Sequence, residues 1–502
     1  MEAEPLAPLL LTLALAVLVM LAISHLLLLG SSTTRRRRSR RPVPTPPLTN
    51  VVINDPAVLR RLLVDHADAF SSRPTPPFPE DFGGTHSINS VPYGSTWRAL
   101  RGNLIAGIFH PTRLGVLAPL QRDAVKGLVA GLSSSITGWR GSEVVVVRDR
   151  LHGAVFGLVA RMCLGDSVRD RDVRTLEREV GRFVFTFAAD SALGRSTLAR
   201  LLHWRRWRRY SGIVNRLSKL ILPIIAARQQ SRRGGTGIRC YVDSLVDLRV
   251  PNNDVDAATT TTTGSKRPLT DRELVRLVFE FLGANTVSVV SCVEWTLAHL
   301  AIRPEVQEKL HHEIITSGSH DLISEDRLRG LAYLRATILE SLRLHPPLSV
   351  IMRNVDAHDL AACGAGAPPA AADDGGTRRV CLVVKVGEVG RNRSMWTDPE
   401  EFRPERFLAG GEAEGVGPVA GPKEIRMMPF GAGRRYCAGV EVAMLHVGYF
   451  LAALVRDFEW ALPVDGHSID LTEKHGFFMV MKTPLRARVT PRASPRGLTI
   501  TT

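Results

Sequence analysis

Apolar positions recur at helical spacing along most of the chain. In the clearest case, Thr270 stands three residues before Glu273, as in a helix-capping box, and the apolar pattern continues to Leu300 before Pro304. A helix of about 32 residues would be roughly 48 Å long. Because apolar residues occupy most of its sides, the pattern predicts a long central helix that is largely buried.

Two shorter helices and a few short strands complete this pattern. One helix is predicted over residues 331–344, before Pro346, and another from just after Cys437 to about Trp460. Strand patterns are short, as in residues 380–386. The body of the chain is therefore predicted to be mainly α with small β-sheets.

The N-terminal segment has a different pattern, an almost unbroken apolar run over residues 9–29. As a helix this run would be roughly 31 Å long, about the thickness of a bilayer core. Glu2 and Glu4 precede it, and six arginines follow it within residues 35–41, so the positive-inside rule places the rest of the chain in the cytosol. A cleavable signal peptide is the alternative, but it normally carries its positive charge before a shorter apolar run.

These patterns divide the chain into three parts. We expect one N-terminal transmembrane anchor over residues 1–30, a basic and proline-rich hinge over residues 31–49, and one folded domain over residues 50–502. The hinge contains four prolines close together, which are incompatible with a continuing helix.

Charge and cysteine content narrow the possible functions. The formal net charge is +16, of which six arginines and two glutamates within residues 1–50 contribute +4, leaving +12 for the rest. This excess indicates an acidic partner, either nucleic acid, an anionic membrane or an acidic protein. The six cysteines include no CxxC pair, which argues against a disulfide scaffold or a zinc ribbon.

A glycine-rich loop that ends in a cysteine, FGAGRRYCAG at residues 430–439, carries the main chemical signal. Cys437 precedes an apolar helix, whose dipole and free amides favour a thiolate. A thiolate is the ligand that pushes electron density into haem iron. Gly433 and Gly439 allow the backbone to approach a planar cofactor, and Arg435 can pair with a propionate. Taken alone, a cysteine is more often an inert core residue. A nucleotide-binding loop is a weaker alternative, because the third glycine of a dinucleotide fingerprint and the Lys-Ser/Thr of a phosphate loop are both absent here.

The loop resembles the haem loop of the cytochrome P450 superfamily, Phe-x-x-Gly-x-Arg-x-Cys-x-Gly, at all five fixed positions. Three further family motifs precede this loop in the order expected for the family: Trp97-x-x-x-Arg101, Glu340-x-x-Arg343 and Pro404-Glu405-Arg406-Phe407. The resemblance covers about residues 50–490. It implies the cytochrome P450 fold, mainly α with small β-sheets and preceded by one transmembrane helix.

The resemblance also implies roles for these residues around haem b (heme b, iron protoporphyrin IX). Cys437 would be the axial ligand of the iron, and Trp97, Arg101 and Arg435 would hold the propionates. Phe430, Gly433 and Gly439 would shape the loop that carries the ligand. Glu340, Arg343 and Arg406 would form a buried structural group that supports this loop.

Within the superfamily, the chain is most similar to the plant cytochrome P450 family numbered 89, A subfamily. Four stretches carry this similarity: residues 62–70, 241–250, 291–300 and 422–433. The similarity implies a monooxygenase of the endoplasmic reticulum membrane, single-pass, with a cytosolic catalytic domain. Its partners would be NADPH–cytochrome P450 reductase, O2 and a small or medium apolar substrate. The acidic docking face of that reductase would suit the +12 of the body.

The chain departs from this resemblance in the central helix. The family's Ala-Gly-x-(Asp/Glu)-Thr falls on residues 284–288, so Asn285 replaces the glycine, Val287 the acid and Ser288 the threonine. The resemblance implies that the acid and the alcohol deliver protons for O–O cleavage. Val287 cannot titrate, whereas Ser288 keeps a hydroxyl. Asn285 and Thr286 are an alternative pair, but Thr286 lies about 200° around the helix from Ser288. Asn285 and Ser288 do share a face, although Asn285 could also only pack against a neighbouring helix.

Two other segments depart from the family pattern. Pro47 nearly adjoins Asn50, where relatives have a further strand and helix, so the first sheet edge and first helix are expected to be missing. The family's propionate-facing basic residue should fall near Asn354, whereas the basic residue here is Arg353. One step along a strand turns a side chain to the other face, so the role of Arg353 stays open.

Three functions follow from these observations. The first is a membrane-anchored haem-thiolate monooxygenase, impaired in part by the loss of the distal acid. The second is a haem-thiolate isomerase or dehydratase, which needs no O2 activation, and the third is a degenerate haem-binding protein. The aromatic and basic run at residues 203–210 could stack on single-stranded nucleic acid or rest at a membrane interface. We favour the membrane and expect no nucleic acid partner, although a solvated helix face explains the run equally well.

Overall fold

The structure is a computed structural model, and the chain divides into two compact units, residues 1–47 and residues 48–502. It describes residues 49–74, 87–136, 143–187, 204–232, 239–252, 265–317, 324–364, 379–463 and 468–492. The anchor predicted over residues 1–30 lies outside these described residues, and so does the hinge up to Leu48. The expected loss of a first sheet edge and first helix also concerns residues that lie outside them.

Helices dominate the described residues. In chain order they are α2 (Pro56–Arg60), α3 (Ser95–Leu104), α4 (Pro111–Ser135), α5 (Val147–Leu164), α6 (Asp170–Phe187), α8 (Trp204–Arg232), α9 (Tyr241–Asp247), α10 (Asp271–Ile302), α11 (Pro304–Thr316), α12 (Glu325–Gly330), α13 (Ala332–Leu344), α14 (Ala357–Ala362), α15 (Val386–Gly390) and α16 (Val440–Asp457). Four single-turn helices accompany them: η1 (Arg61–Asp65), η3 (Ile105–Phe109), η4 (Pro404–Phe407) and η5 (Gly433–Arg435).

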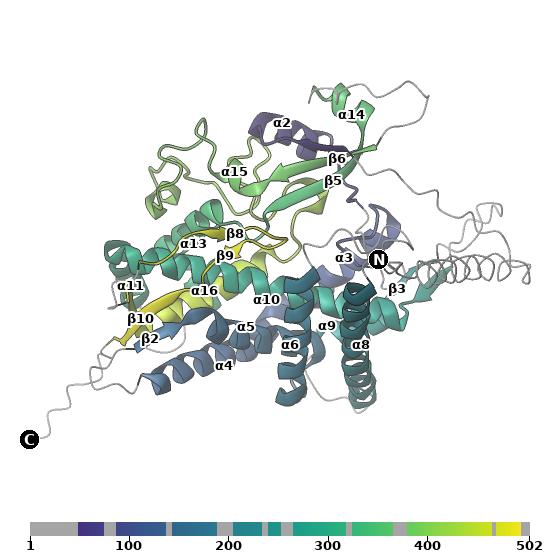
Figure 1. Cartoon of the computed structure of the whole chain (residues 1–502), viewed down its shortest axis with the longest axis horizontal. Helices are drawn as coiled ribbons and strands as arrows, with labels where there is room; N and C mark the ends of the chain where they lie inside the picture. Colours follow the sequence, from purple (N-terminus) through teal and green to yellow (C-terminus); the bar gives the residue numbers. More distant parts are fainter. Residues whose placement is uncertain are drawn as a thin grey trace, which may run out of the picture. The chain divides into compact units, whose positions relative to one another are not determined.

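The central helix α10 organises the helical layer. Its N-terminus carries the predicted capping box, in which the Thr270 amide donates to the Glu273 carboxylate at 2.8 Å and the Glu273 amide donates to the Thr270 hydroxyl. Among the described residues α10 is the helix long and apolar enough to cross a membrane. It is instead largely buried against α5, α16, α13 and α8, and it crosses the middle of Figure 1. The predicted buried central helix is confirmed.

Two three-stranded sheets and two strand pairs flank the helices. One sheet has the order β1 (Thr49–Val52), β6 (Arg379–Lys385), β5 (Val350–Asp356), with β1 parallel and β5 antiparallel to β6. The other has the order β2 (Glu143–Val146), β10 (Arg486–Pro491), β7 (Phe458–Ala461) and is antiparallel. The pairs are β3 (Arg249–Pro251) with β4 (Lys266–Pro268) and β8 (Glu473–Lys474) with β9 (Val480–Met481). The prediction of a mainly α body with small sheets is confirmed.

Two element boundaries differ from the prediction. The helix expected to reach Trp460 ends at Asp457, and Trp460 lies in β7, where it pairs with Val489. The strand expected over residues 380–386 ends at Lys385, because Val386 begins α15. The helix ends at Asp457 because the residues that follow it pair with β10, which an apolar pattern does not show.

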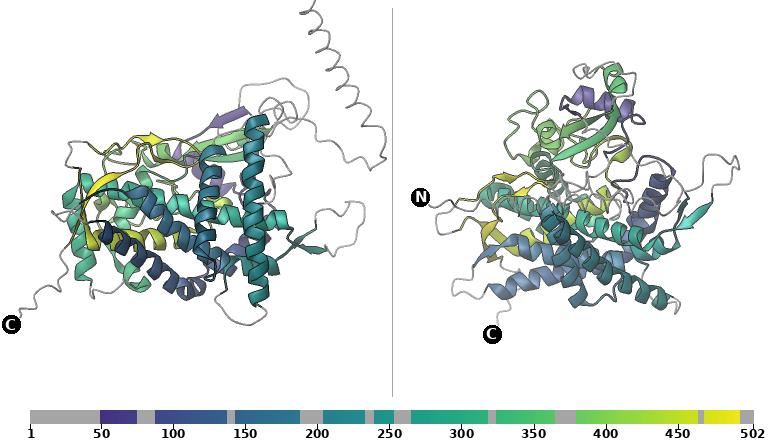
Figure 2. Two further views of the ribbon diagram at one scale, coloured as in Figure 1. Left: turned by 60° about the horizontal axis from the view of Figure 1, so that its bottom comes forward. Right: turned by 45° about the vertical axis from the view of Figure 1, so that its right-hand side comes forward.

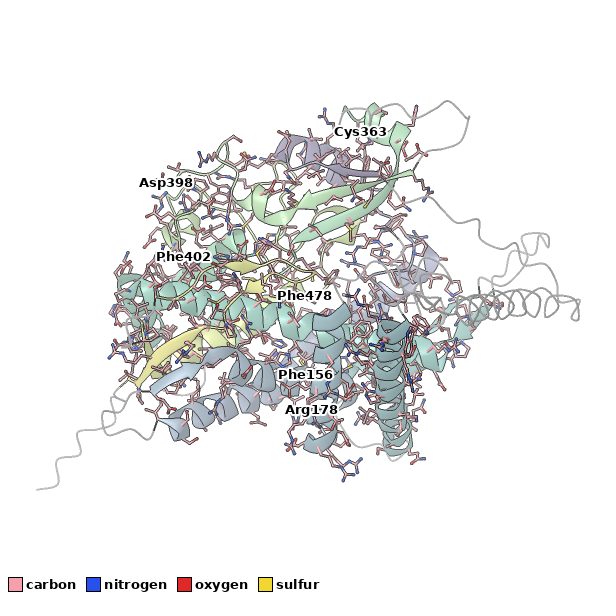
Figure 3. All side chains as sticks on the ribbon, viewed as in Figure 1. Phe156, Arg178, Cys363, Asp398, Phe402 and Phe478 are labelled. Carbon is pink, nitrogen blue, oxygen red and sulfur yellow. The ribbon has the colours of Figure 1, made fainter. Side chains whose placement is uncertain are left out.

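Three hydrophobic clusters form the core of the described residues, and the smallest of them surrounds Trp396. The largest one fills the helical layer and includes Phe156 on α5, whereas the second lies under the β1–β6–β5 sheet and includes Cys363 after α14. Figure 3 shows these two residues in separate regions, Phe156 among the helices and Cys363 beside the sheet. The right view of Figure 2 shows the sheet standing apart from the helical layer. The loop at residues 430–439 connects these two clusters, because Ala432 belongs to the cluster under the sheet, and Phe430 and Ala438 pack against the larger one.

Candidate functional site

The glycine-rich loop has a shape that requires its glycines. Gly433 has φ +69°, in the left-handed region, and a Cβ there would collide with the Leu63 carbonyl oxygen. Gly431 has φ +76°. A Cβ on Gly439 would stand 3.2 Å from the Phe109 ring. The loop therefore packs its backbone directly against η1 and η3, and Phe430 closes it by accepting the Cys437 amide at 2.8 Å through its carbonyl.

Cys437 holds its sulfur at the start of α16. The Gly439 amide, immediately before Val440, donates to Sγ at 3.3 Å. Burial raises the pKa of the Cys437 thiol, whereas the Gly439 hydrogen bond and the charges of Arg101 and Arg73 lower it. The side chain nevertheless keeps exposed surface. Cys437 is thus largely surrounded by protein, while part of its side chain stays accessible.

Aromatic rings connect the cysteine loop to the central helix. Phe109 of η3 touches the Gly439 position and stacks on Phe281 of α10 at 5.8 Å between ring centroids. One turn further along α10, Ala284 is exposed although Gly283 before it is buried. Phe109 therefore lies between the cysteine loop and this stretch of α10 and contacts both.

Trp97 and Arg101 lie on α3 beside the cysteine loop. Arg101 Nη1 donates to the Tyr436 carbonyl at 2.8 Å, and its guanidinium stands over the Trp97 and Tyr436 rings. Among the described residues, Trp97 Nε1 and Arg101 Nη2 are buried donors without a hydrogen-bond partner. Such orphaned donors are rare in proteins and indicate a polar group that they would bind.

Arg435 contacts protein carbonyls with all three of its nitrogens. Nε donates to Ser71 at 2.8 Å, Nη1 to Ile88 at 3.0 Å and Nη2 to Val91 at 2.6 Å. Its guanidinium also lies 4.7 Å from the Trp97 ring centroid. Arg435 is thus shown to fix two chain segments beside the loop. Its expected contact with a propionate would use the N–H groups that remain on Nη1 and Nη2.

Two further arginines complete a basic cluster: Arg353, whose role the sequence left open, and Arg73, which no motif indicated. Burial and then the charges of Arg73 and Arg435 lower the pKa of Arg353, and burial, Arg73 and Arg101 lower the pKa of Arg435 to about 10. Arg353 is buried on the same face of β5 as Ile351. The structure therefore places Arg353, and not Asn354, on the inward face. The positive charges in this cluster, which are those of Arg73, Arg101, Arg353 and Arg435, repel one another. Anionic groups bound beside them would relieve this repulsion.

The three polar candidates on the central helix are turned onto its own backbone. Asn285 Nδ2 donates to the Phe281 carbonyl at 2.8 Å, Thr286 Oγ1 to Leu282 at 2.8 Å and Ser288 Oγ to Ala284 at 2.6 Å. Thr286 is buried, whereas Asn285 and Ser288 are partly exposed. The structure thus keeps Thr286 apart from the other two candidates.

Val287 faces a different neighbourhood. It lines a cavity of about 200 Å³ between α5, α6 and α10, together with Arg148, Asp149, His152 and Gly181. His152 Nδ1 is 2.7 Å from Glu177 Oε1. A carboxylate at position 287 would face these titratable groups, whereas the valine presents only an apolar wall.

The group formed by Glu340, Arg343 and Arg406 lies behind the loop and is fully buried. Arg343 donates to both Glu340 oxygens at 2.7 and 2.8 Å, and Arg406 Nε donates to Oε1 at 3.3 Å. Arg343 also donates to the carbonyls of Gly390 and Pro399. The three charges thus connect α13, α15 and η4.

The comparisons with known proteins identify the class to which this fold and site belong. The family model for cytochrome P450 matches residues 45–490, so the chain belongs to the cytochrome P450 family. It is 34% identical over 452 residues to cytochrome P450 89A9 of Arabidopsis thaliana, covering 88% of this chain and 84% of the relative. It is 28% identical to flavonoid 3'-monooxygenase CYP75B137 of Crocosmia x crocosmiiflora, covering 89% and 85%.

Solved structures support the fold. A zebra fish cytochrome P450 structure with abiraterone superposes with a TM-score of 0.66 at 20% identity, covering 90% of this chain and 96% of that one. The predicted superfamily membership and its similarity to family 89 are confirmed. Membership implies a haem-iron cofactor, and the residues present fit one: orphaned donors on Trp97 and Arg101 and the four arginines suit propionates, and Cys437 suits iron.

Proposed function

We propose that the protein is a membrane-anchored haem-thiolate monooxygenase that inserts one oxygen atom of O2 into a small or medium apolar metabolite. Electrons would come from NADPH through NADPH–cytochrome P450 reductase. The observation that carries this proposal is the position of Cys437, whose sulfur accepts the Gly439 amide beside a cluster of arginines. Membership in the cytochrome P450 family supports it.

The residues of the site would have two roles, ligation of the iron and binding of the propionates. Haem b, when bound, supplies the reductive activation of O2. Cys437 would hold the iron, and the Gly439 amide would disperse charge on its sulfur. Trp97 and Arg101 would bind propionates through their buried donors, with Arg435, Arg353 and Arg73 around them.

The distal side would handle protons through weaker groups than usual. Ser288 Oγ can hold a proton and pass it on if its 2.6 Å bond to the Ala284 carbonyl opens. The Asn285 amide, on the same side, uses one N–H on the Phe281 carbonyl and keeps the second one for donation. Val287 contributes no proton, so we expect part of the NADPH to be consumed without product.

The partners and location follow from the same proposal. The first turns of α8 carry exposed Trp204 and exposed Arg205, Arg206, Arg208 and Arg209, which suits the surface of the endoplasmic reticulum membrane. An apolar run long enough for a membrane span precedes the described residues, at residues 9–29. The basic body suits an acidic reductase. We assign no nucleic acid partner.

The test is a set of spectra followed by turnovers. The reduced protein with CO should give the strongly red-shifted band of thiolate-bound haem, and a Cys437→Ser variant should lose it. With reductase and NADPH, a panel of apolar metabolites should yield hydroxylated product. Absence of the band in the wild-type protein would overturn the proposal and leave a degenerate protein as the remaining function.

A second function on the same scaffold is favoured by one observation. Val287 replaces the acid that O2 activation uses in the family, and isomerisation or dehydration of an already oxidised substrate would not need it. If the CO band is present but NADPH and reductase yield no product, hydroperoxide substrates should then be converted without NADPH.

A further inference from the structure

Glu280 ties the central helix to a loop that belongs to none of the sequence motifs. It lies on α10, one turn before Ala284, and its carboxylate accepts the Ile88 amide at 3.0 Å and the Asn89 amide at 2.8 Å. Two consecutive backbone N–H groups directed at one carboxylate fix both the position and the direction of the loop. We call residues 87–91 the bridging loop.

The carbonyls of the bridging loop point to the arginines of the site. Ile88 and Val91 accept Arg435 Nη1 and Nη2 at 3.0 and 2.6 Å, and the Asn89 carbonyl is 3.5 Å from Arg73 Nη1. The loop thus donates to Glu280 on one side and accepts from the arginines on the other. A displacement of the loop from α10 would move Arg435 and Arg73 with it.

Glu280 also balances charge in this cluster. It is the carboxylate whose charge acts on both Arg73 and Arg435, raising the pKa of each against the effect of burial. Burial raises its own pKa, and the charges of Arg276 and Arg73 and the two loop amides lower it. Arg73 in turn acts on Cys437. Glu280 is therefore linked to the cysteine through Arg73, whose charge acts on both groups.

We propose that Glu280 is a positioning residue of the haem site, which holds the bridging loop so that Arg435 and Arg73 face the propionates and whose charge lowers the reduction potential of the iron. The inference rests on the haem-thiolate function proposed above and adds a residue to it. Glu280 acts through the loop and the arginines, not by contact with substrate.

The Glu280→Gln variant separates these effects from packing, because the shape of the side chain is kept. Its amide oxygen can accept one loop N–H, but its NH2 group meets the other, so one backbone donor loses its partner. Haem release to apomyoglobin should become roughly tenfold faster. Removal of a negative charge favours the reduced iron, so the midpoint potential should rise.

Glu294→Gln is the matched control. Glu294 is also buried on α10, and it accepts the Leu485 amide at 3.0 Å and Arg148 Nε at 2.8 Å. It lies 14 residues along the helix, roughly 21 Å from Glu280. Its variant should lose thermal stability, yet the midpoint potential and the haem release rate should stay at the wild-type values.

Glu280→Asp provides the second arm, because it keeps the charge on a shorter side chain. Its haem release should be fast, as in Glu280→Gln, while its midpoint potential stays near the wild-type value. The proposal is overturned if Glu280→Gln matches Glu294→Gln in both potential and haem release, or if Glu280→Asp matches Glu280→Gln in potential. A wild-type protein without the CO band would instead refute the haem-thiolate function itself.

Discussion

The polar groups behind the cysteine loop and those on the central helix are bonded in opposite ways. Glu340, Arg343 and Arg406 are completely buried, and their hydrogen bonds cross between α13, α15 and η4. Asn285 and Ser288 are partly exposed, and each bonds only a carbonyl one turn back on its own helix. The first group specifies tertiary structure, because removal of any member leaves the remaining charges buried without their partner. The second group contributes little to the fold.

The comparison separates the scaffold from the chemistry. The motifs that hold the loop are complete, and each finds its partners in the structure. The departures on the central helix, Asn285, Val287 and Ser288, take no part in these motifs, and Asn285 and Ser288 bond their own helix. We therefore expect a chain that folds and binds its cofactor normally but delivers protons less efficiently than its relatives.

The largest effect should come from Glu340→Ala. The change leaves Arg343 and Arg406 buried without their carboxylate, which costs about 3–5 kcal/mol. The variant should lose haem and unfold well below the wild-type temperature, as measured by the CO band and by circular dichroism. Glu308→Ala, which removes the exposed carboxylate that pairs with Arg492, should change the stability by less than about 1 kcal/mol. Equal losses in the two variants would show that the buried group does not specify the scaffold.

Gly433→Ala should come next. The alanine would have to keep φ +69° and would collide with the Leu63 carbonyl, so the loop that carries Cys437 must shift. Gly410 has φ +76° but open space around it, and Gly410→Ala should therefore cost only about 1 kcal/mol for the left-handed backbone. Haem content and thermal midpoint of both variants provide the measurement. A Gly433→Ala protein with normal haem content would contradict the close packing of the loop.

A smaller effect should appear as acid lability of the helical layer. Burial lowers the pKa of His446 to about 4, and burial followed by the charges of His345 and Arg303 lowers the pKa of His299 well below 6.5. The unfolded chain then binds protons first, so the stability present above pH 6.5 is lost as the pH falls toward the folded values. The loss should be about 1.4 kcal/mol per histidine for each pH unit below 6.5.

Urea unfolding at pH 7.5 and 5.5 measures this loss. His446→Gln should reduce the difference between the two pH values, whereas a change at His358, whose side chain is exposed, should leave it unaltered. A stability that is equal at the two pH values would show that the buried histidines take up protons without cost.

The fold could be predicted from the sequence where local pattern and chain-wide structure agree. The capping box of Thr270 and Glu273 and the apolar faces that follow indicated α10 within two residues of its end. Trp460 could not be assigned to a strand, because the apolar run that contains it is compatible with a helix and with a strand. Only its pairing with Val489 places it in β7. The N-terminal anchor stays a prediction.

The site could be predicted only where motifs mark it. Cys437, Trp97 and Arg101 lie in motifs, and the structure brings them together. Arg73 and Glu280 carry no motif, and they act through the bridging loop, which meets them only in the folded chain. Arg353 was left open because its face of β5 depends on the strand register, which the sequence pattern did not fix. The one sequence feature that could have indicated Arg353 was its position beside the residue that matches the family's propionate-facing basic residue.

The most direct measurement of the account is the share of NADPH electrons recovered as hydrogen peroxide, in the wild-type protein and in the Asn285→Gly, Val287→Glu, Ser288→Thr variant. Both proteins should show the same CO band, because the scaffold is unaffected. The wild-type protein should release a large share as peroxide, and the variant should release several-fold less and form correspondingly more product. Equal peroxide yields from the two proteins, with equal CO bands, would contradict the claim that the central helix limits proton delivery.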